Sequence, residues 1–342
     1  MTPLDAIDRA LYFLDRSHES DFKTKAFVRA REVLRALPPE EIEERAAANR
    51  LTELDGIGSA TARLVAEALT GEADLPYLQK LDAETRLVVS DAAAAYRVAL
   101  KGDCHLHTRW SDGSAEVETM ARTAQALGHE YLVVTDHSPR LTIAHGLNRD
   151  RLVQQLDEID AVNERLDGIT VLAGMEVDIL EDGALDLDED LLERLDLVVA
   201  SVHSKLKMER SAMTQRMVLA VANPHVDVLG HCTGRHLPKR GPSDFDADYV
   251  FAACAKFGTA VEINCRPERL DPPQELLELA LDYGCQVMMD TDAHAPGQLE
   301  WQVNGCEKAA EAGVPAEQIL NTRDLAGLRS WLHTEPAQRL GA

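Results

Sequence analysis

From Lys101 onward, short apolar segments alternate with longer amphipathic ones, and this alternation limits the fold more than any other feature of the chain. The apolar segments read as buried β-strands and cover residues 131–135, 170–173, 197–200, 226–229, 259–263 and 286–289. Stretches such as 117–127, 149–164 and 274–283 between them have the spacing of amphipathic helices. Strands that alternate with helices are typical of a parallel sheet, so this region is predicted to be an α/β domain.

Side chains that can bind a metal ion follow nearly every apolar segment. His105 and His107 end a further short strand, where alternation along the backbone places both imidazoles on one face. The full set of candidate metal ligands is His105, His107, Asp112, His137, Glu176, His203, His231, Asp292 and His294. In a barrel of parallel strands, the carboxyl ends of the strands are where catalytic residues gather. We therefore expect these side chains to converge on one pocket.

Nine imidazole and carboxylate donors exceed what one tetrahedral ion uses, which predicts two or three divalent metal ions. This donor set suits Zn or Mn, with Fe as a further option, better than Ca or Mg. Glu176 can bridge two ions. Clustered ions lower the pKa of a bridging water and stabilise phosphoryl oxygens, so the predicted chemistry is hydrolysis of a phosphoester by a metal-held hydroxide.

The amino-terminal region is predicted to be helical. Apolar residues follow the helical repeat within 4–14 and 27–37, and the prolines at 38 and 39 end the second helix. Residues 51–70 then resemble a helix–hairpin–helix motif, in which backbone N–H groups and a helix N-terminus suit one DNA phosphate. The candidate DNA contacts are Gly56, Ile57, Gly58 and Ser59.

This hairpin departs from the motif at two positions. Asp55 stands where proline is usual, and Ser59 stands where lysine is often found. Both departures reduce the attraction for phosphate, so a purely structural hairpin is the alternative to DNA binding.

Several longer segments resemble the polymerase-and-histidinol-phosphatase (PHP) family, and specifically the PHP domain of bacterial family X DNA polymerases. They cover residues 174–179, 201–204, 230–235 and 262–271, and residues 4–80 resemble the helical domain of the same polymerases. The resemblance implies an α/β fold, a distorted (β/α)7 barrel preceded by a small all-α helix–hairpin–helix domain. It also implies three metal sites: His105, His107, Glu176 and Asp292; then Glu176, His203 and His231; then Asp112, His137 and His294.

The predicted organisation is a helical domain over 1–80, a connector over 81–100 and a PHP phosphoesterase domain over 101–342. Only about thirty residues separate the hairpin from the barrel, far fewer than a polymerase palm domain of ordinary size requires. Residues 71–100 also lack the closely spaced aspartates of a nucleotidyltransferase centre. Polymerase activity is therefore expected to be absent.

Arginines near the predicted ligands are candidates for substrate binding, because a forked guanidinium group matches phosphate oxygens. They are Arg235, Arg240, Arg266 and Arg269. A surface ion pair within this acidic chain is the alternative for each of them.

The chain carries a formal net charge of −24, which opposes broad contact with the phosphate backbone of nucleic acid. Contact with DNA would therefore be local. No apolar run has membrane-spanning length, and the amino terminus lacks the features of a signal peptide, so we expect a cytoplasmic monomer without a membrane partner.

The resemblance favours hydrolysis at DNA 3′ ends, as a 3′–5′ exonuclease or a 3′-phosphatase in DNA repair. Two alternatives stay open. One is a phosphatase for small phosphomonoesters of the histidinol-phosphate type, which the net charge favours. The other is a non-catalytic DNA-binding module with a vestigial metal site.

Overall fold

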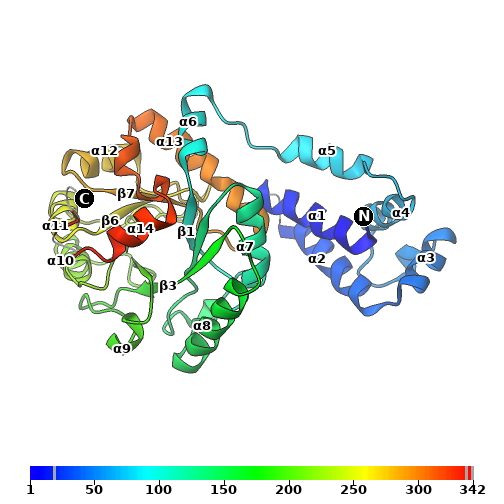
Figure 1. Cartoon of the computed structure of the whole chain (residues 1–342), viewed down its shortest axis with the longest axis horizontal. Coiled ribbons are helices and arrows are strands. Elements are labelled where there is room, and N and C mark those ends of the chain that lie inside the picture. Colours follow the sequence, from blue (N-terminus) through cyan, green and yellow to red (C-terminus); the bar gives the residue numbers. More distant parts are fainter. Residues whose placement is uncertain (18–20, 336–337, 340–342) are drawn as a thin grey trace. The chain divides into compact units, whose positions relative to one another are not determined.

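The computed structural model describes residues 1–17, 21–335 and 338–339 of the 342-residue chain. The described residues belong to two compact units, Met1–Val88 and Val89–Ala342. The first unit is all-helical, and the second contains every β-strand of the described residues (Figure 1).

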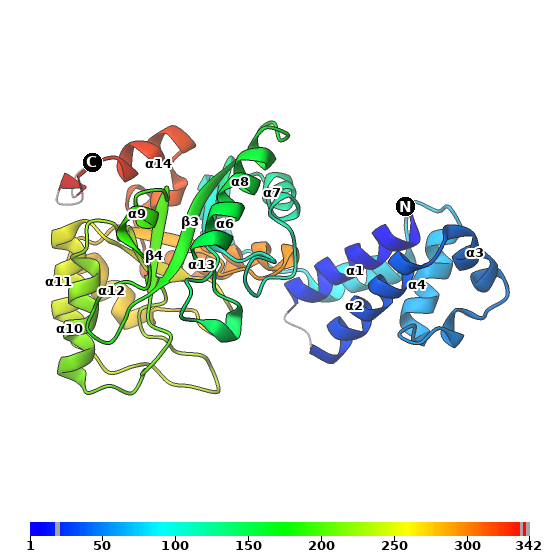
Figure 2. The ribbon, with the colours of Figure 1, turned by 90° about the horizontal axis from the view of Figure 1, so that it is seen from below.

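Helices of the first unit pack around a small apolar core. Their bounds are α1 Pro3–Arg16, α2 Asp21–Ala36, α3 Pro39–Ala47, α4 Ser59–Leu69 and α5 Pro76–Thr85, with a 3₁₀ turn at Leu51–Glu53. Thr2 caps α1, and α1 packs against both α2 and α4 (Figure 2). Ile7, Leu14 and Leu64 are fully buried between these helices. The predicted amino-terminal helical region is thus confirmed, and α4 begins at Ser59 as expected.

The second unit is a nearly closed barrel of seven parallel strands in the order β1 to β7. The strands are β1 Gly102–Leu106, β2 Tyr131–Val134, β3 Thr170–Asp178, β4 Leu197–Ser201, β5 Val228–Leu229, β6 Ala260–Asn264 and β7 Val287–Asp290. Just beyond the end of β7, the amide of Asp292 donates to the carbonyl of His105 over 2.8 Å, and the amide of His107 donates to the carbonyl of Ala293 over 2.7 Å. These bonds join the first strand to the last, and the predicted α/β barrel is confirmed.

Helices surround the barrel, and the apolar side chains of its strands belong to two clusters. Their bounds are α6 Asp91–Ala99, α7 Val117–Ala126, α8 Arg149–Asn163, α9 Glu189–Leu192, α10 Arg210–Val221, α11 Ala247–Phe257, α12 Gln274–Asp282, α13 Gln302–Ala312 and α14 Leu325–Leu332. One set of strand residues, including Leu132 and Val198, packs with α7, α8, α10 and α11. The alternate set, including Val133 and Val199, packs with Trp331 of α14. This alternation follows from the two-residue period of a strand.

Residues 81–100 contain the end of α5 and the whole of α6. Within the second unit, α6 lies beside α13, where the hydroxyl of Tyr96 donates to the carbonyl of Val314 over 2.8 Å. Ser90 also hydrogen-bonds the carboxylate of Glu307.

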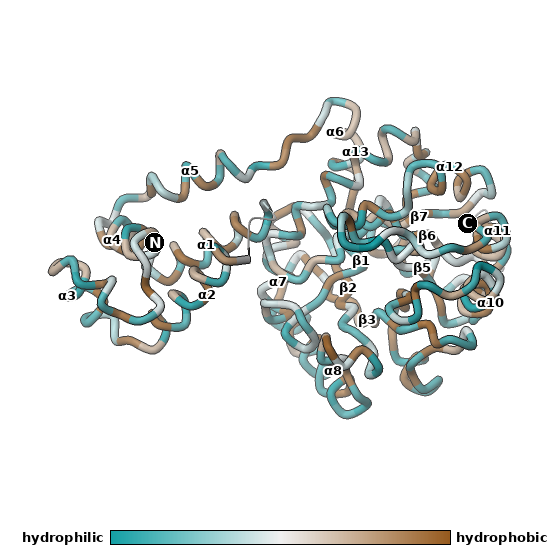
Figure 3. The backbone as a smooth tube through the Cα atoms, turned by 180° about the vertical axis from the view of Figure 1, so that it is seen from behind, coloured by the Kyte–Doolittle hydropathy of each residue, from teal (hydrophilic) through white to brown (hydrophobic). Residues whose placement is uncertain are grey.

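No helix among the described residues has both the length and the apolar character needed to cross a membrane. Hydrophobic stretches along the chain are short and interrupted by hydrophilic ones (Figure 3).

Strand β3 is longer than the apolar pattern predicts. The predicted strand ends at Ala173 and leaves Glu176 beyond it, but the observed strand continues to Asp178. Residues 170–173 pair with β2, whereas residues 174–178 pair with β4. The ladder to β4 keeps this second half extended whatever its side chains are, and an apolar run alone does not reveal that. As a result Glu176 projects from a paired strand, which fixes its position more firmly than a loop would.

Gly174 marks the residue at which β3 changes partners, and the space around it tests this packing. A Cβ there would lie 2.6 Å from Cγ1 of Val133 and 2.8 Å from the carbonyl oxygen of Leu197. We expect Gly174→Ala to lower the free energy of unfolding by about 1–3 kcal/mol, as other overpacked cores do. Urea unfolding measures this. Gly241→Ala is the matched control because nothing lies within 4 Å of its added Cβ; equal stability of the two variants would contradict the packing argument.

Candidate metal centre

The nine predicted ligands lie together at the carboxyl end of the barrel. His105 belongs to β1 and Glu176 to β3, while the others follow β1, β2, β4, β5 and β7 directly. The hydrogen bonds and ion-pair distances given below link all nine into one continuous group. The structure thus brings together residues that are spread over almost the whole barrel sequence.

The carboxylate of Glu176 occupies the middle of this group and is 1% exposed. Its Oε1 lies 2.8 Å from Nε2 of His231 and 3.2 Å from Nε2 of His203. Its Oε2 faces a second set of imidazole nitrogens, on His137 at 2.9 Å, His105 at 3.4 Å and His107 at 3.6 Å. Each oxygen thus faces a separate set of donors, which is the arrangement expected of a carboxylate that bridges two ions.

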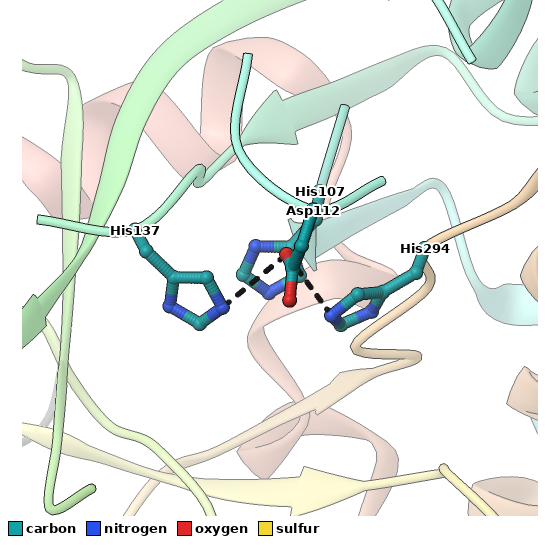
Figure 4. Close-up of side chains that lie close together, drawn as sticks. All are labelled: His107, Asp112, His137 and His294. Carbon is teal, nitrogen blue, oxygen red and sulfur yellow. Dashed lines mark ion pairs between the residues drawn. The ribbon is translucent and has the colours of Figure 1, made fainter. Parts of the chain in front are cut away.

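A second cluster lies at the more exposed side of the centre. His107, Asp112, His137 and His294 each offer one donor atom, and these atoms all lie within 4.8 Å of one another. Figure 4 shows the Asp112 carboxylate between two of the rings, with Oδ1 at 3.5 Å from Nε2 of His137 and 3.4 Å from Nε2 of His294. The carboxylate of Asp112 is 34% exposed, so this side of the centre reaches solvent.

A third cluster contains His105, His107 and Asp292. Oδ1 of Asp292 lies 3.4 Å from Nε2 of His107. The backbone of Asp292 is left-handed with φ of 53°, a conformation that is unfavourable outside glycine and is often found at functional sites.

The observed grouping differs in two respects from the ligand sets that the family resemblance implies. His137, which the resemblance assigns to the site of Asp112 and His294, also groups with Glu176 and His203. The second difference concerns His107. The resemblance assigns His107 to the site of His105 and Asp292 alone. In the structure the His107 ring also stacks on the His137 ring, with centroids 4.2 Å apart, and joins the cluster of Asp112 and His294. His107 therefore lies between two of the three predicted sites.

The carboxylates of the centre are held in their ionised form, whereas the pKa values of its imidazoles are shifted in both directions. Burial alone would raise the pKa of Glu176, but the imidazoles of His203 and His105 outweigh it and hold that pKa well below its usual value. Burial likewise opposes ionisation of Asp292, whereas Arg269 holds its pKa well below the usual range. Burial, with the charges of His137 and His294, holds the pKa of His107 well below its usual value. Burial disfavours the charged forms of His105 and His203, but the neighbouring carboxylates outweigh it and raise the pKa of His105 well above its usual value and that of His203 to about 9. A metal ion that binds these two imidazoles would displace their protons, because metal binding requires neutral imidazole and ionised carboxylate.

One buried nitrogen adds to this fit. Nε2 of His203 makes no hydrogen bond within the described residues, although it lies 3.2 Å from Oε1 of Glu176. A ligand nitrogen that faces a carboxylate without bonding to it is what a metal ion between the two would require. The residues at this centre therefore fit a group of divalent ions, and imidazole with carboxylate is the donor set that Zn, Mn and Fe prefer.

Buried carboxylates behind the ligands were missed by sequence reasoning. Oδ1 of Asp178 lies 2.6 Å from Nδ1 of His203, and Oε1 of Glu262 lies 2.5 Å from Nδ1 of His105. Glu262 also accepts a hydrogen bond from the amide of His231. Partners of this kind fix the orientation of a ligating ring and raise its basicity. One signal was available for Asp178, because it stands two residues after Glu176 and so shares its face of β3.

The four candidate substrate arginines fall into two pairs. Arg235 donates from Nε to the carbonyl of Arg269 over 2.6 Å and from Nη2 to the carbonyl of Leu270, and Arg240 donates to the carbonyl of Gly234 over 2.9 Å. These two guanidinium groups support loop backbone.

Arg266 and Arg269 instead face the metal centre. Nε of Arg269 donates to Oδ2 of Asp292 over 2.9 Å, and Nη1 of Arg266 lies 3.0 Å from Nδ1 of His294. Nη1 of Arg269 is buried and has no hydrogen-bond partner in the described part of the chain. Both guanidinium groups thus lie against predicted metal ligands, and their role in binding substrate stays a prediction.

A parallel barrel that gathers imidazoles and carboxylates around a bridging glutamate defines a metal-dependent phosphoester hydrolase. The chain belongs to the PHP family: the model of the PHP domain matches residues 103–289. The prediction of several divalent ions is confirmed by this membership together with the donor clusters.

Curated relatives carry two kinds of name. The chain is 37% identical over 233 residues to the DNA polymerase/3′-5′ exonuclease PolX of Bacillus subtilis. The aligned region covers 68% of this chain and 41% of that protein. The chain thus spans about two fifths of the length of this relative. It is also 28% identical over 253 residues to a probable phosphatase of Thermoanaerobacter, covering 70% of this chain and 96% of that protein.

Among solved structures, the chain resembles histidinol phosphate phosphatase from Lactococcus lactis, crystallised with zinc, L-histidinol and phosphate. The TM-score is 0.44 at 19% sequence identity, and the match covers 62% of this chain and 94% of that one.

Removal of metal ions should destabilise the barrel. An ion that binds only the folded state stabilises it by about 4 kcal/mol at a thousandfold excess over its Kd. We expect a chelator to lower the melting temperature, and added Zn or Mn to restore it, in a calorimetric scan. The Glu176→Gln variant is the control, since loss of the bridging charge should leave little metal to remove. An unchanged melting temperature of the chelated parent would contradict a metal-loaded centre.

Proposed function

We propose that this protein hydrolyses phosphoesters at DNA 3′ ends, as a 3′–5′ exonuclease or a 3′-phosphatase, without polymerase activity. The observation that carries the proposal is the 37% identity to the Bacillus subtilis DNA polymerase/3′-5′ exonuclease over 68% of this chain. The helical unit supports it, because it places a hairpin before a helix, as in the DNA-binding motif that the sequence resembles.

The nine clustered side chains would hold the ions, and the two arginines that face the centre would bind the phosphate. Bound divalent ions supply a hydroxide at neutral pH and neutralise charge on the phosphoryl oxygens. Nη1 of Arg269 offers a free donor beside Asp292, and Arg266 offers a second guanidinium beside His294. Forked, permanently charged donors stabilise the negative charge that builds up on phosphorus-bound oxygens during hydrolysis.

The hairpin has the backbone of a phosphate-binding turn. Gly56 has φ of +94°, which requires glycine, and the side chain of Ile57 is buried as an anchor. The amides of Ile57 and Gly58 are already used, because they donate to the carbonyl of Leu54 over 3.0 Å and to Oγ1 of Thr61 over 2.9 Å. The attraction for a phosphate would therefore come mainly from the start of α4. Ser59 at the start of α4 is exposed and lies where the positive end of the helix dipole would attract a phosphate.

Small phosphomonoesters are the second candidate substrates, as for histidinol phosphatase. The probable phosphatase of Thermoanaerobacter supports this, because the match covers 96% of its length and needs no helical unit to account for it. The net charge of −24 also works against long DNA contacts. The non-catalytic alternative predicts bound metal without any turnover.

Turnover of matched substrates tests the proposal. We expect release of label from 3′-labelled DNA carrying a 3′-hydroxyl or a 3′-phosphate to exceed turnover of histidinol phosphate at equal concentration. Glu176→Gln should lower turnover more than about 100-fold, because loss of a partner behind a ligand already costs 10–100-fold. Glu84→Gln, at an exposed position of α5, is the control. Faster turnover of histidinol phosphate would favour the second candidate. Because no polymerase activity is expected, deoxynucleotides added to the labelled DNA should not lengthen its 3′ end.

Charge at the hairpin tests DNA contact separately. We expect Ser59→Lys to lower the KM for DNA a few-fold and Ser59→Glu to raise it, since an exposed ion pair with a bound phosphate contributes about 0.2–1 kcal/mol. Turnover of a small phosphomonoester should stay the same in both variants. Gln79→Lys is the control, because it adds the same charge at an exposed position of α5. If Ser59→Lys and Gln79→Lys act alike, the hairpin is structural.

A further inference from the structure

Helix α8 carries a polar stripe that faces two ligand-bearing loops. Arg151, Gln155 and Glu158 follow one another at spacings of four and three residues, which puts them on one face of the helix. Their neighbours Leu152 and Ile159 face the barrel core. The first loop, 107–114, follows β1 and contains Asp112, and the second loop, 137–147, follows β2 and begins with His137.

The guanidinium of Arg151 joins these two loops to each other. Its Nη1 donates to the carbonyl of His145 over 2.5 Å and to the carbonyl of Gly146 over 3.3 Å, both in the second loop. Its Nη2 donates to the carbonyl of Trp110 in the first loop. One rigid fork therefore holds the backbone of both loops, which a flexible single-point donor could not do equally well.

The other two residues of the stripe secure the first loop. Oε2 of Glu158 accepts from the indole nitrogen of Trp110 over 2.7 Å, and Nε2 of Gln155 donates to Oδ2 of Asp136 over 2.5 Å. Asp136 in turn accepts from the amides and hydroxyls of both Thr108 and Ser111 at 2.5–3.2 Å. Because Asp136 directly precedes His137, this buried carboxylate ties the first loop to the start of the second.

Two ligands depend on these bonds for their position. Asp112 follows Ser111 and is more exposed than the other two carboxylate ligands, Glu176 and Asp292. The second loop is closed at its base, where the amide of Leu147 donates to the carbonyl of His137 over 2.8 Å. The loops therefore have defined shapes, and α8 sets the distance between them.

We propose that α8 fixes the Asp112 and His137 side of the metal centre, and that Arg151 is the positioning residue for the ion held by His107, Asp112, His137 and His294. This inference rests on the metal centre of the proposed function and not on its turnover. Arg151 touches no ligand side chain in the described structure; it acts through the carbonyl groups of the two loops.

Arg151→Met tests the proposal, with Arg149→Met as the matched control. Arg149 lies two residues earlier in α8 and pairs on the surface with Asp188 and Asp190. We expect Arg151→Met to weaken the most loosely bound zinc ion 10–100-fold in a chelator competition, with the remaining ions bound as in the parent. After chelation, amide hydrogen exchange within 107–114 and 137–147 should be faster in Arg151→Met than in the chelated parent, and exchange in β4 should be the same in both. Arg149→Met should match the parent in both measurements.

Further variants keep the test decisive. Arg151→Lys should recover part of the zinc affinity, because one ammonium group reaches the carbonyls of only one loop at a time. Glu158→Ala is a milder change and should raise amide hydrogen exchange in 107–114 alone. If Arg151→Met does not fold, this variant tests the proposal in its place. Parent-like zinc binding by Arg151→Met, or equal weakening of all ions with exchange raised throughout the barrel, would overturn the proposal. Turnover is scored separately: a parent that binds its zinc but hydrolyses no phosphoester refutes the proposed function and leaves the role of Arg151 standing.

Discussion

Everything in the barrel depends on one buried carboxylate that five imidazoles surround. Glu176 has nitrogen atoms of five histidines within 3.6 Å of its two oxygens, and these histidines arrive from four other strand ends. A buried charge without partners would cost several kcal/mol, so the strands must be in the register that brings the imidazoles to it. The second half of β3 meets this requirement because its ladder to β4 places Glu176 at a fixed height in the barrel.

The imidazoles themselves are held by a further set of carboxylates. Asp178 and Glu262 each hold a ligand ring, and Asp136 holds the loop that carries Asp112, so these parts of the site do not depend on rotamer preference alone. Hydrogen bonds to an ionised acceptor are roughly twice as strong as neutral ones, which suits a site that must keep its shape before any ion is bound. Arg235 contributes a charged donor instead of a charged acceptor. Its guanidinium donates to the backbone carbonyl of Arg269, and the Arg269 side chain in turn donates to Asp292. Preorganisation in this barrel is therefore mostly electrostatic.

Local patterns of strand and helix predicted a parallel α/β domain, and the resemblance to the PHP family predicted that this domain is a barrel. The nine donors were predicted because metal-competent residues follow nearly every strand. The structure brings these donors together, whereas their sharing among individual ions stays a prediction. What the pattern missed is long-range. The second half of β3 is held by β4, which a single apolar run cannot show. The roles of Glu262 and Arg151 arise from contacts with residues 157 positions and 41 positions away, respectively. His107 joins two clusters only because the loop after β1 folds back toward His294.

Charge explains why such an acidic chain can still attract a phosphate. Three carboxylates, Asp112, Glu176 and Asp292, lie among the ligands, and Asp178 and Glu262 stand directly behind them. Divalent ions, together with Arg266 and Arg269, would offset these negative charges, and an ion beside Asp112 would add positive charge at the exposed side of the centre. Elsewhere the net charge of −24 repels phosphate. Such a surface favours a substrate whose reacting phosphate is terminal and can enter the centre while the rest of the molecule stays outside. The ion beside Asp112 would then decide how strongly that phosphate is drawn in, and the two loops that α8 holds would decide whether that ion is bound.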